Sequence, residues 1–222
     1  RARLHGAYAS LDADSLEAAS GRSWRACIFA LCALHAVMAE RGRFGKAGCA
    51  LPYDLGQPEL RTALGALGTL FADAEARRGA VEWDGVFSVV AHTHYGLAIA
   101  DLYDKRVLRA HARPWLSAAL AEQSYSLHAA DYAIPNAVER DATLAKIAQQ
   151  LPAEEPPALY GMDAGTAARA REAEGELLLR AAEAVAAAAA RDGGQLPTPT
   201  TGGGALASQC AGGEAACLLY TS

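Results

Sequence analysis

The clearest pattern in the chain is an apolar stripe that begins soon after residue 20. Apolar side chains recur at steps of three and four residues up to Met38, which is the period of one face of an α-helix. Gly42 and Gly45 are expected to stop this helix. Its nearly apolar run, residues 26–39, is shorter than the roughly 20 residues that a membrane span needs. The pattern therefore predicts a buried core helix over residues 24–41.

Shorter apolar patterns predict further helices, separated by Gly and Pro. The expected helices cover residues 7–19, a stretch from about Glu59 to a break at Arg78-Gly79, residues 98–122, about 140–151, and 166–191. In the first of these, Ser10 is a candidate N-cap and Gly21 is expected to close the helix. The last is the longest, and its Ala, Arg and Glu content predicts that it is the least well buried of the long helices.

Two central segments have less regular patterns. Residues 83–91 carry strand-like side chains at spacing that also suits a helix, so periodicity does not decide between the two. The apolar side of the helix expected over residues 98–122 carries Ile99, Leu102, Tyr103 and Val107. Pro114 is expected to begin a second short helix there, because proline tolerates a first turn and breaks a helix interior.

Connecting segments are marked by Gly, Pro and Thr. Residues 45–59 predict a surface connector, and residues 152–157 predict a linker. From residue 193 the chain is low in periodic apolar positions and rich in Gly, Pro and Thr. Such a segment cannot bury enough apolar area to offset the entropy of ordering it, so the sequence predicts a disordered tail over residues 193–222.

Charge and cysteine content narrow the classes of function. The net charge of -5 and the pI near 5.7 argue against a nucleic-acid partner, because no stripe of Lys and Arg is present to displace phosphate counterions. No membrane partner is expected either. The five cysteines are an odd set without tight pairing: Cys27, Cys32, Cys49, Cys210 and Cys217. With no signal-like segment at its start, the chain is expected in a reducing, intracellular compartment.

Candidate catalytic and metal-binding patterns are incomplete. The sequence holds no GxxxxGK[ST] loop and no GxSxG turn, so neither nucleotide binding nor a hydrolase triad is predicted. His92 and His94 lack third and fourth ligands for a metal, and the spacing of Cys27, Cys32 and His35 matches no zinc or haem pattern. The two cysteines are interpreted as small apolar residues, and His35 as a core histidine.

Residues 28–53, IFALCALHAVMAERGRFGKAGCALPY, resemble a signature of dynein heavy chains. In that signature Leu-Cys-x-x-His-Ala-Val and Glu-Arg-x-x-Phe-Gly are followed by x-x-Gly-x-x-x-Pro-Tyr. The matching positions are Phe29, Leu31, Cys32, His35, Ala36, Val37, Glu40, Arg41, Phe44, Gly45, Gly48, Pro52 and Tyr53.

A second stretch is similar to the family's Trp-Asp/Glu followed by Asn-Tyr-Gly-Gly-Arg-Val-Thr-Asp-Asp-Trp-Asp-Arg-Arg. The matching positions are Trp83, Asp84, Tyr95, Gly96, Ile99, Asp101, Tyr103, Asp104, Lys105 and Arg106. The departures are His94 for Asn, Leu97 for Gly, Ala98 for Arg, Ala100 for Thr and Leu102 for Asp. This loop has therefore lost much of the polar chemistry of the family motif.

A third set of positions is similar to the family's Tyr-x-x-Pro, Leu-Pro and Tyr-Gly-Met sites: Tyr132, Pro135, Leu151, Pro152, Tyr160, Gly161 and Met162. The resemblance spans about residues 7–204, and residues 205–222 match no known pattern. It implies a mainly α protein with three parts. These are a helical AAA+ lid bundle of the sixth module over residues 1–122, the α-rich start of the C-terminal domain over 123–192, and the flexible tail over 193–222.

The resemblance implies a structural role without catalytic, cofactor-binding or metal-binding residues in this chain. In dyneins the lid packs against a ring of ATPase modules that drives minus-end-directed movement along microtubules, with ATP and magnesium held by other modules. The implied partners are the rest of the ring and, through the parent protein, other dynein chains and microtubules. The implied location is the cytoplasm and cytoskeleton, with the axoneme of a cilium favoured. Arg61 is the one residue placed to offer a charge to nucleotide bound on a neighbouring module.

Two other functions stay open on the sequence alone. The first is a stand-alone helical interaction module derived from the same family. The second, more distant, is a metal-dependent enzyme that uses His92 and His94.

Overall fold

The structure is a computed structural model that describes residues 1–135 and 139–191. Over these residues the chain is helical, apart from loops and one isolated antiparallel bridge between Ser126 and Ala133. The prediction of a mainly α protein is confirmed. The tail that was predicted to be disordered, residues 193–222, lies outside the described residues.

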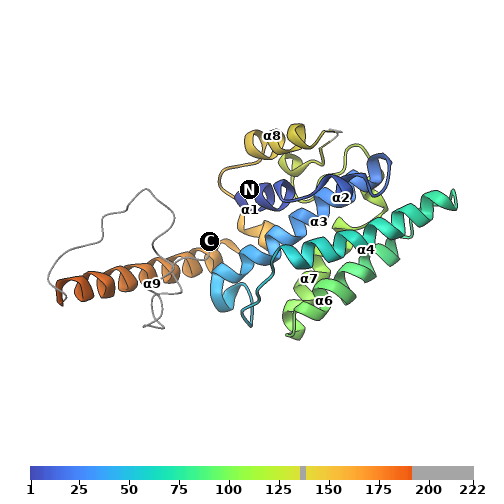
Figure 1. The fold of residues 1–222 in the computed structure, drawn as a ribbon. Helices are drawn as coiled ribbons and strands as arrows, with labels where there is room; N and C mark the ends of the chain where they lie inside the picture. The colour runs from blue at the N-terminus through green and yellow to red at the C-terminus, as the bar shows by residue number, and fades with distance from the viewer. Residues whose placement is uncertain (136–138, 192–222) are drawn as a thin grey trace. The chain divides into compact units, whose positions relative to one another are not determined.

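The elements follow one another as short and long helices joined by brief loops (Figure 1). Their bounds are α1 Ala2–Ala9, α2 Ala13–Glu17, α3 Gly21–Arg41, the 3₁₀-helix η1 Gly42–Ala47, α4 Gln57–Ala76, α5 Trp83–Ser88, the π-helical η2 Val89–His94, α6 Tyr95–Ala98, α7 Leu102–Trp115, the 3₁₀-helices η3 Ala118–Ala121 and η4 Ala130–Tyr132, α8 Arg140–Gln150, the 3₁₀-helix η5 Pro157–Tyr160, and α9 Ala164–Arg191. The chain divides into a compact unit over residues 1–175 and a second unit over residues 176–222.

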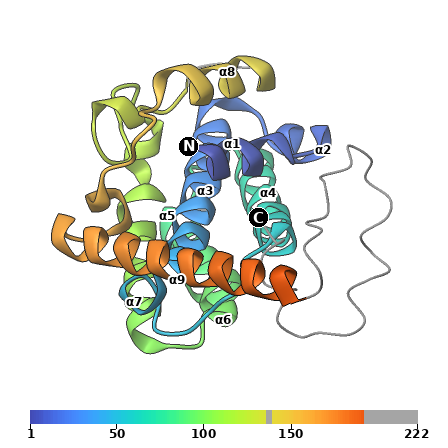
Figure 2. The ribbon, with the colours of Figure 1, turned by 90° about the vertical axis from the view of Figure 1, so that its left-hand side faces the viewer.

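α3 is the core helix of the first unit. It contacts α1, α4 and α7, which lie around it (Figure 1 and Figure 2). Leu31, Leu34 and Ile28 are fully buried, and most residues of the helix are buried. A helix that is apolar on nearly all sides needs neighbours on all sides, and these three helices supply them. The core helix predicted from the apolar stripe is confirmed.

By length and composition, α3 together with η1 could cross a membrane. However, 78% of its most apolar window is buried inside this structure. Such burial is expected for the core helix of a folded domain. The apolar stripe explains both the membrane-like composition of the helix and its burial.

The first expected helix is wrong in detail, because residues 7–19 belong to two short helices. Ser10 ends α1 instead of capping a helix start, and its hydroxyl donates to the carbonyl oxygen of Ala7 at 2.7 Å. Asp12 is the cap of α2 and accepts from the backbone N–H of Ser15 at 2.8 Å. Gly21 opens α3 instead of closing a helix, with a φ of 88° that favours glycine.

The ambiguous segment from Trp83 is helical. α5 continues through the π-helical turn η2 into α6, so that the undecided residues form one interrupted helix. Val86, Val90 and Tyr95 are fully buried along it. Their burial against α3, α4 and α7, which the local sequence does not specify, decides the conformation.

The expected apolar side of the helix over residues 98–122 is wrong at Leu102 and Tyr103, although Ile99, which precedes α7, is fully buried as expected. α7 starts only at Leu102, and the side chains of Leu102 and Tyr103 are 71% and 70% exposed. The side of α7 that faces the core carries Asp104, Leu108, Ala112 and Trp115. Pro114 does not begin a new helix, since it lies in the last turn of α7.

The three remaining predicted helices are confirmed. The helix expected from about Glu59 to a break at Arg78-Gly79 is α4, Gln57–Ala76, which ends just before that break. α8 begins at Arg140, contacts α1, and lies along one edge of the unit (Figure 2). α9 is the longest helix of the described residues, as expected. Leu177, Leu178 and Leu179 are each more than half exposed on it.

Candidate functional site

Several of the motif residues that the sequence singled out meet where α3 ends. Arg41 closes α3, the glycine-containing segment of η1 follows it, and the first turn of α7 lies against the loop beyond. The site therefore joins two separate parts of the sequence, residues 40–53 and the start of α7, and η5 adds a third. Its charged members, Arg41 and Asp104, are 5% and 4% exposed, so each needs a partner inside the protein.

Arg41 joins two distant segments through backbone carbonyl groups. Its guanidinium donates to the carbonyl oxygen of Gly48 at 2.5 Å and to that of Tyr160 in η5. Burial lowers the pKa of Arg41 from its ordinary value, and the nearby Cys49 and Asp104 oppose that shift. Its Nε atom has no hydrogen-bond partner among the described residues. Two of the three guanidinium nitrogens thus act as a brace between η1 and η5.

The backbone next to this brace requires glycine at two motif positions, Gly45 and Gly48. Gly45 has a φ of 55° and a ψ of -138°, a conformation that side chains with a β-carbon avoid. A β-carbon on Gly48 would lie 1.7 Å from the carbonyl oxygen of Arg41, well inside contact distance. The backbone N–H of Cys49 donates to the carbonyl oxygen of Gly45 at 2.9 Å and closes the turn.

Asp104 fastens the same loop to α7. Its carboxylate accepts from the backbone N–H of Ala50 at 2.9 Å and from the hydroxyl of Tyr53 at 2.9 Å. The Tyr53 hydroxyl in turn accepts from the backbone N–H of Asp101 at 3.0 Å. Asp101 is the N-cap of α7 and accepts from the backbone N–H of Tyr103 at 2.7 Å. One tyrosine therefore links the loop both to the cap and to the first turn of α7.

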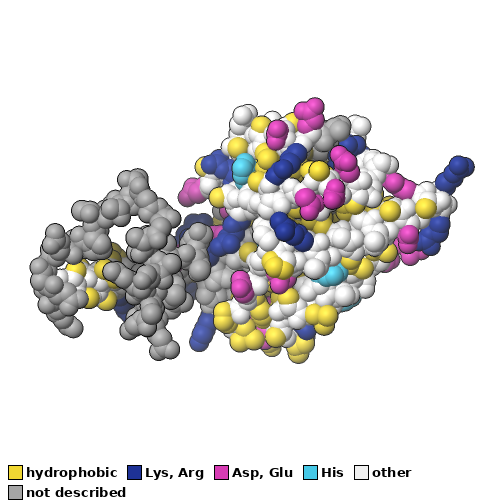
Figure 3. All heavy atoms as spheres, viewed as in Figure 1, with side chains coloured by type: hydrophobic (Ala, Val, Ile, Leu, Met, Phe, Trp, Pro, Cys, Tyr) yellow, Lys and Arg dark blue, Asp and Glu magenta, His cyan; other side chains and the backbone are white. Residues whose placement is uncertain are grey.

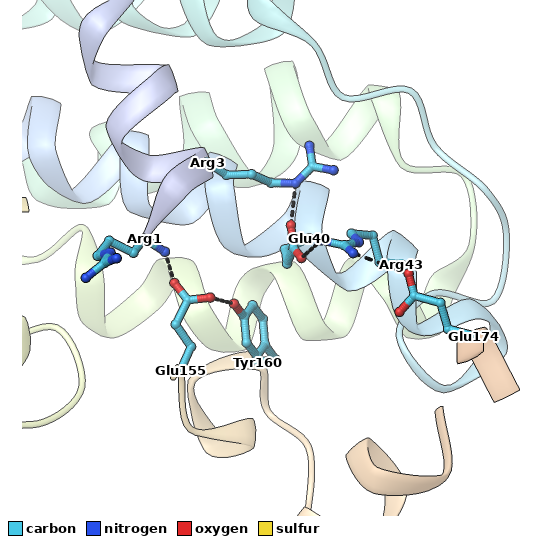
Figure 4. Close-up of polar contacts among 7 residues, drawn as sticks. All are labelled: Arg1, Arg3, Glu40, Arg43, Glu155, Tyr160 and Glu174. Atoms are coloured by element: carbon cyan, nitrogen blue, oxygen red, sulfur yellow. Dashed lines mark hydrogen bonds and ion pairs between the residues drawn. The ribbon is translucent and has the colours of Figure 1, made fainter. Parts of the chain in front are cut away.

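Glu40 lies next to this brace in a surface network of charged groups (Figure 4). It accepts from Arg3 of α1 and from Arg43 at 2.8 Å, and Arg43 also reaches Glu174 at 3.3 Å. Because these side chains are partly exposed, the pairs contribute little stability individually.

Phe44 and Tyr160 pack together beside the charged network, with ring centroids 5.4 Å apart. The Tyr160 hydroxyl donates to Glu155, which also accepts from the amino group of Arg1 (Figure 4). Burial and the Glu155 carboxylate raise the pKa of Tyr160. A hollow of about 370 Å³ lies among these side chains.

His35 and Tyr95 form a second, fully internal polar pair. The Nδ1 atom of His35 lies 2.9 Å from the hydroxyl oxygen of Tyr95, and the rings meet edge to face. Burial lowers the pKa of His35 to about 4 and raises that of Tyr95. Gly96 allows the π-helical turn at this place, since a β-carbon there would lie 2.4 Å from the carbonyl oxygen of Ala91. The pair connects α3 to α6.

The two groups considered for metal binding lie in different places, the cysteines in the core and His92 at the surface. His92 is exposed and contacts the Ser88 hydroxyl at 3.3 Å and the ring of Phe87. Cys27 and Cys32 are buried in the core, and burial raises the pKa of each thiol. Within residues 1–135 and 139–191, no group of three His, Cys, Asp or Glu side chains could hold a metal.

Other motif residues lie outside the network. Trp83 packs against Phe71 with ring centroids 5.8 Å apart, whereas Pro52, Arg61 and Arg106 are exposed. Sequence reasoning missed Arg3, Glu155, Glu174 and the Tyr160 carbonyl group as parts of the site. It also missed His111, beside Gly161 and Arg41, whose pKa burial lowers to about 4. Backbone carbonyl groups and long-range surface pairs leave no local sequence signal.

Comparisons with known proteins agree with the resemblance. The family model described as "Dynein heavy chain AAA lid domain" matches residues 24–166. The chain is 29% identical over 162 residues to mouse (Mus musculus) dynein axonemal heavy chain 5 and 26% identical over 162 residues to human (Homo sapiens) dynein axonemal heavy chain 8. It is 28% identical over 163 residues to the dynein-1-alpha heavy chain of the flagellar inner arm I1 complex of Chlamydomonas reinhardtii.

These matches cover 71% to 73% of this chain, but only 3% to 4% of each relative. The chain thus corresponds to a small part of the length of the relatives it matches. The family model covers well over half of the chain, including the brace around Arg41, the Asp104 contacts and the pair of His35 and Tyr95. The chain therefore belongs to the dynein heavy chain family, through its AAA lid domain.

Proposed function

We propose that this chain is a structural part of a dynein heavy chain, a lid in the AAA+ ring of a minus-end-directed microtubule motor, with no catalytic site of its own. The supporting observation is how its buried charges are used. Arg41 and Asp104 form their hydrogen bonds with the chain's own backbone and with Tyr53. A lid must transmit force between neighbours as a rigid body, and internal braces of this kind suit that task.

The proposed roles of the parts of the chain follow those of the dynein family. Residues 1–122 would form the lid of the sixth module, residues 123–192 the start of the C-terminal domain, and residues 193–222 a flexible tail. The motif residues would act structurally, by holding the lid's helices and loops in place. ATP and magnesium would bind to other modules of the parent motor, because phosphoryl transfer needs a backbone cradle and a metal-binding Ser, Thr or Asp in one place.

The proposed partners are the rest of the AAA+ ring and, through the parent protein, other dynein chains and microtubules. The proposed location is the cytoskeleton, specifically the axoneme of a cilium or flagellum. Three relatives named as axonemal or flagellar arm heavy chains support this location. Neighbouring coding sequence offers an independent check: a series of P-loop modules upstream is expected, and their absence would favour a stand-alone module.

Calorimetric titration of the purified chain with ATP and magnesium tests the absence of a site in this chain. No saturable heat is expected at micromolar concentrations, and no phosphate release over hours. Arg61 is exposed at the start of α4, so the Arg61→Ala variant should behave like the parent chain. Saturable micromolar binding, or turnover that one substitution abolishes, would overturn the proposal.

A further inference from the structure

An exposed apolar patch surrounds the start of α7. Its members are Leu51, Leu97, Leu102 and Tyr103, with exposed fractions of 46%, 77%, 71% and 70%. We call these four residues the α7 patch. Apolar side chains gather along the lower edge of the molecule, over α6 and the loop after η1 (Figure 3). Scattered exposed leucines are ordinary, but a group this exposed at one place indicates a binding surface.

Internal hydrogen bonds hold the patch together. Ala50 and Tyr53, on either side of Leu51, are bonded to Asp104 and to the backbone of Asp101. Leu51 is thereby kept beside the first turn of α7, which carries Leu102 and Tyr103. Leu97 lies in α6, which contacts α7 directly. The patch is therefore preformed, and a partner would not have to order it.

A basic stripe continues the patch along α7. Arg106 and Arg109 lie four and seven residues after Leu102, on the same exposed side of the helix. Neither forms an ion pair with any acidic side chain of the described chain, whereas Arg113, one turn further, pairs with Asp84 at 2.8 Å. The guanidinium of Arg106 lies 5.5 Å from the centre of the Tyr103 ring. Two cations are thus available next to the apolar group.

Two members of the patch depart from the dynein motif. Leu97 and Leu102 stand where the dynein motif described above has Gly and Asp. Replacing a carboxylate by leucine at Leu102 removes a negative charge from the first turn of α7 and exposes an apolar side chain in its place. An apolar side chain exposed to water does not stabilise the fold, so Leu97 and Leu102 are more readily explained by contact with a partner.

We propose that the α7 patch and its basic stripe bind an acidic amphipathic helix of a separate protein. The apolar face of such a helix would cover Leu102, Tyr103 and their neighbours, and its carboxylates would pair with Arg106 and Arg109. Apolar anchors next to unpaired arginines are the side chains enriched at the centre of protein interfaces. This inference goes beyond the proposed role in the ring and does not depend on it.

An anionic membrane is the competing occupant, because it too attracts apolar and basic side chains. The surroundings favour a protein instead. Asp54 is exposed one residue beyond Tyr53, and the chain as a whole carries a net charge of -5. A membrane surface would repel both, whereas a helix can place its few carboxylates opposite the two arginines alone.

Fluorescence anisotropy with labelled synthetic peptides tests the proposal on the full chain. The probe is an amphipathic helical peptide with Leu on one face and Glu along its border. One control peptide has the same composition in scrambled order, and the other has Lys in place of Glu. Saturable, salt-sensitive binding of the probe is expected, with much weaker binding of both controls. Equal binding of the scrambled peptide, or no binding, would overturn the proposal.

Substitutions of the arginines and of the apolar residues test whether the probe peptide binds at the α7 patch and its basic stripe. The double variant Arg106→Glu/Arg109→Glu should weaken probe binding by roughly tenfold or more, as should Leu102→Ser/Tyr103→Ser. Arg77→Glu, at an exposed arginine after α4, should leave it unchanged. All these positions are exposed, so circular dichroism and the melting temperature should match the parent chain. Unchanged affinity in the patch variants would contradict the assignment.

Two further measurements test whether a second copy of the chain or a membrane covers the α7 patch instead. Sedimentation velocity should show that the patch variants and the parent chain have the same oligomeric state. Flotation with vesicles of phosphatidylserine and phosphatidylcholine should show no binding. Concentration-dependent self-association lost in Leu102→Ser/Tyr103→Ser, or vesicle binding lost in the arginine variant, would replace the proposed partner by a second copy or a membrane.

Discussion

The carbonyl oxygen of Arg41 and the α-carbon of Gly48 approach so closely that a β-carbon on Gly48 would lie 1.7 Å from that oxygen. The same approach lets the Gly48 carbonyl group accept from the Arg41 guanidinium at 2.5 Å. Backbone packing and the buried hydrogen bond therefore depend on each other. A glycine at this position is required by geometry, independently of any reaction.

Gly48→Ala should destabilise the chain by roughly 2 kcal/mol or more, because the methyl group would displace backbone and disturb the Arg41 brace. Urea unfolding followed by circular dichroism measures the loss. Gly65→Ala is the matched control: Gly65 is exposed inside α4 with nothing within 4 Å of the added carbon. That change should stabilise by roughly 0.5–1 kcal/mol. Equal effects at the two positions would contradict the close approach.

Tyr53→Phe should cost roughly 1–3 kcal/mol, since it leaves the Asp104 carboxylate and the Asp101 backbone N–H each without one partner. Hydrogen exchange of the Asp101 amide should also become faster. Tyr103→Phe removes a hydroxyl from an exposed ring and should change stability by less than about 0.5 kcal/mol. If both variants were neutral, the link between the loop and α7 would have no energetic role.

Leu31→Ala should cost roughly 2–5 kcal/mol, because Leu31 is fully buried at the centre of α3 and its loss opens a cavity. Leu97→Ala, at a side chain that is 77% exposed, should cost less than about 0.5 kcal/mol. Thermal and urea unfolding of both variants give the comparison. A small loss at Leu31 would mean that α3 does not form the core.

The buried His35 should make stability depend on pH. Its folded-state pKa of about 4 lies below the ordinary 6.5, so between these values the unfolded chain binds more protons than the folded chain. This contribution is fully present above pH 6.5 and is lost as the pH falls towards 4. Between pH 7 and pH 5 the loss should be about 2 kcal/mol.

His35→Gln isolates that contribution from those of the carboxylates and of His111, which stay in place. The loss of stability between pH 7 and pH 5 should shrink by about 2 kcal/mol in the variant, whatever its stability at pH 7. Urea unfolding at both pH values gives the two differences. An unchanged pH dependence would show that His35 is accessible to protons in the folded protein.

The sequence by itself determined the helical class, the core helix and the family. The apolar stripe of α3 is long and periodic, and a helix apolar on nearly all sides has few alternatives to burial. The positions of Gly45 and Gly48 were visible as motif residues. The sequence did not show why glycine is needed there. Gly45 has a positive φ and Gly48 makes a close backbone approach, and both are properties of the folded backbone.

Tertiary structure decided which face of α7 is buried. Leu102 and Tyr103 fit the apolar period but are exposed, while Asp104 is buried because Ala50 and Tyr53 offer it hydrogen bonds. Those donors lie about fifty residues away in the sequence, where local periodicity carries no information about them. Local patterns measure the preference of a segment for water or core. Which polar groups find partners in the core depends on contacts that exist only after folding.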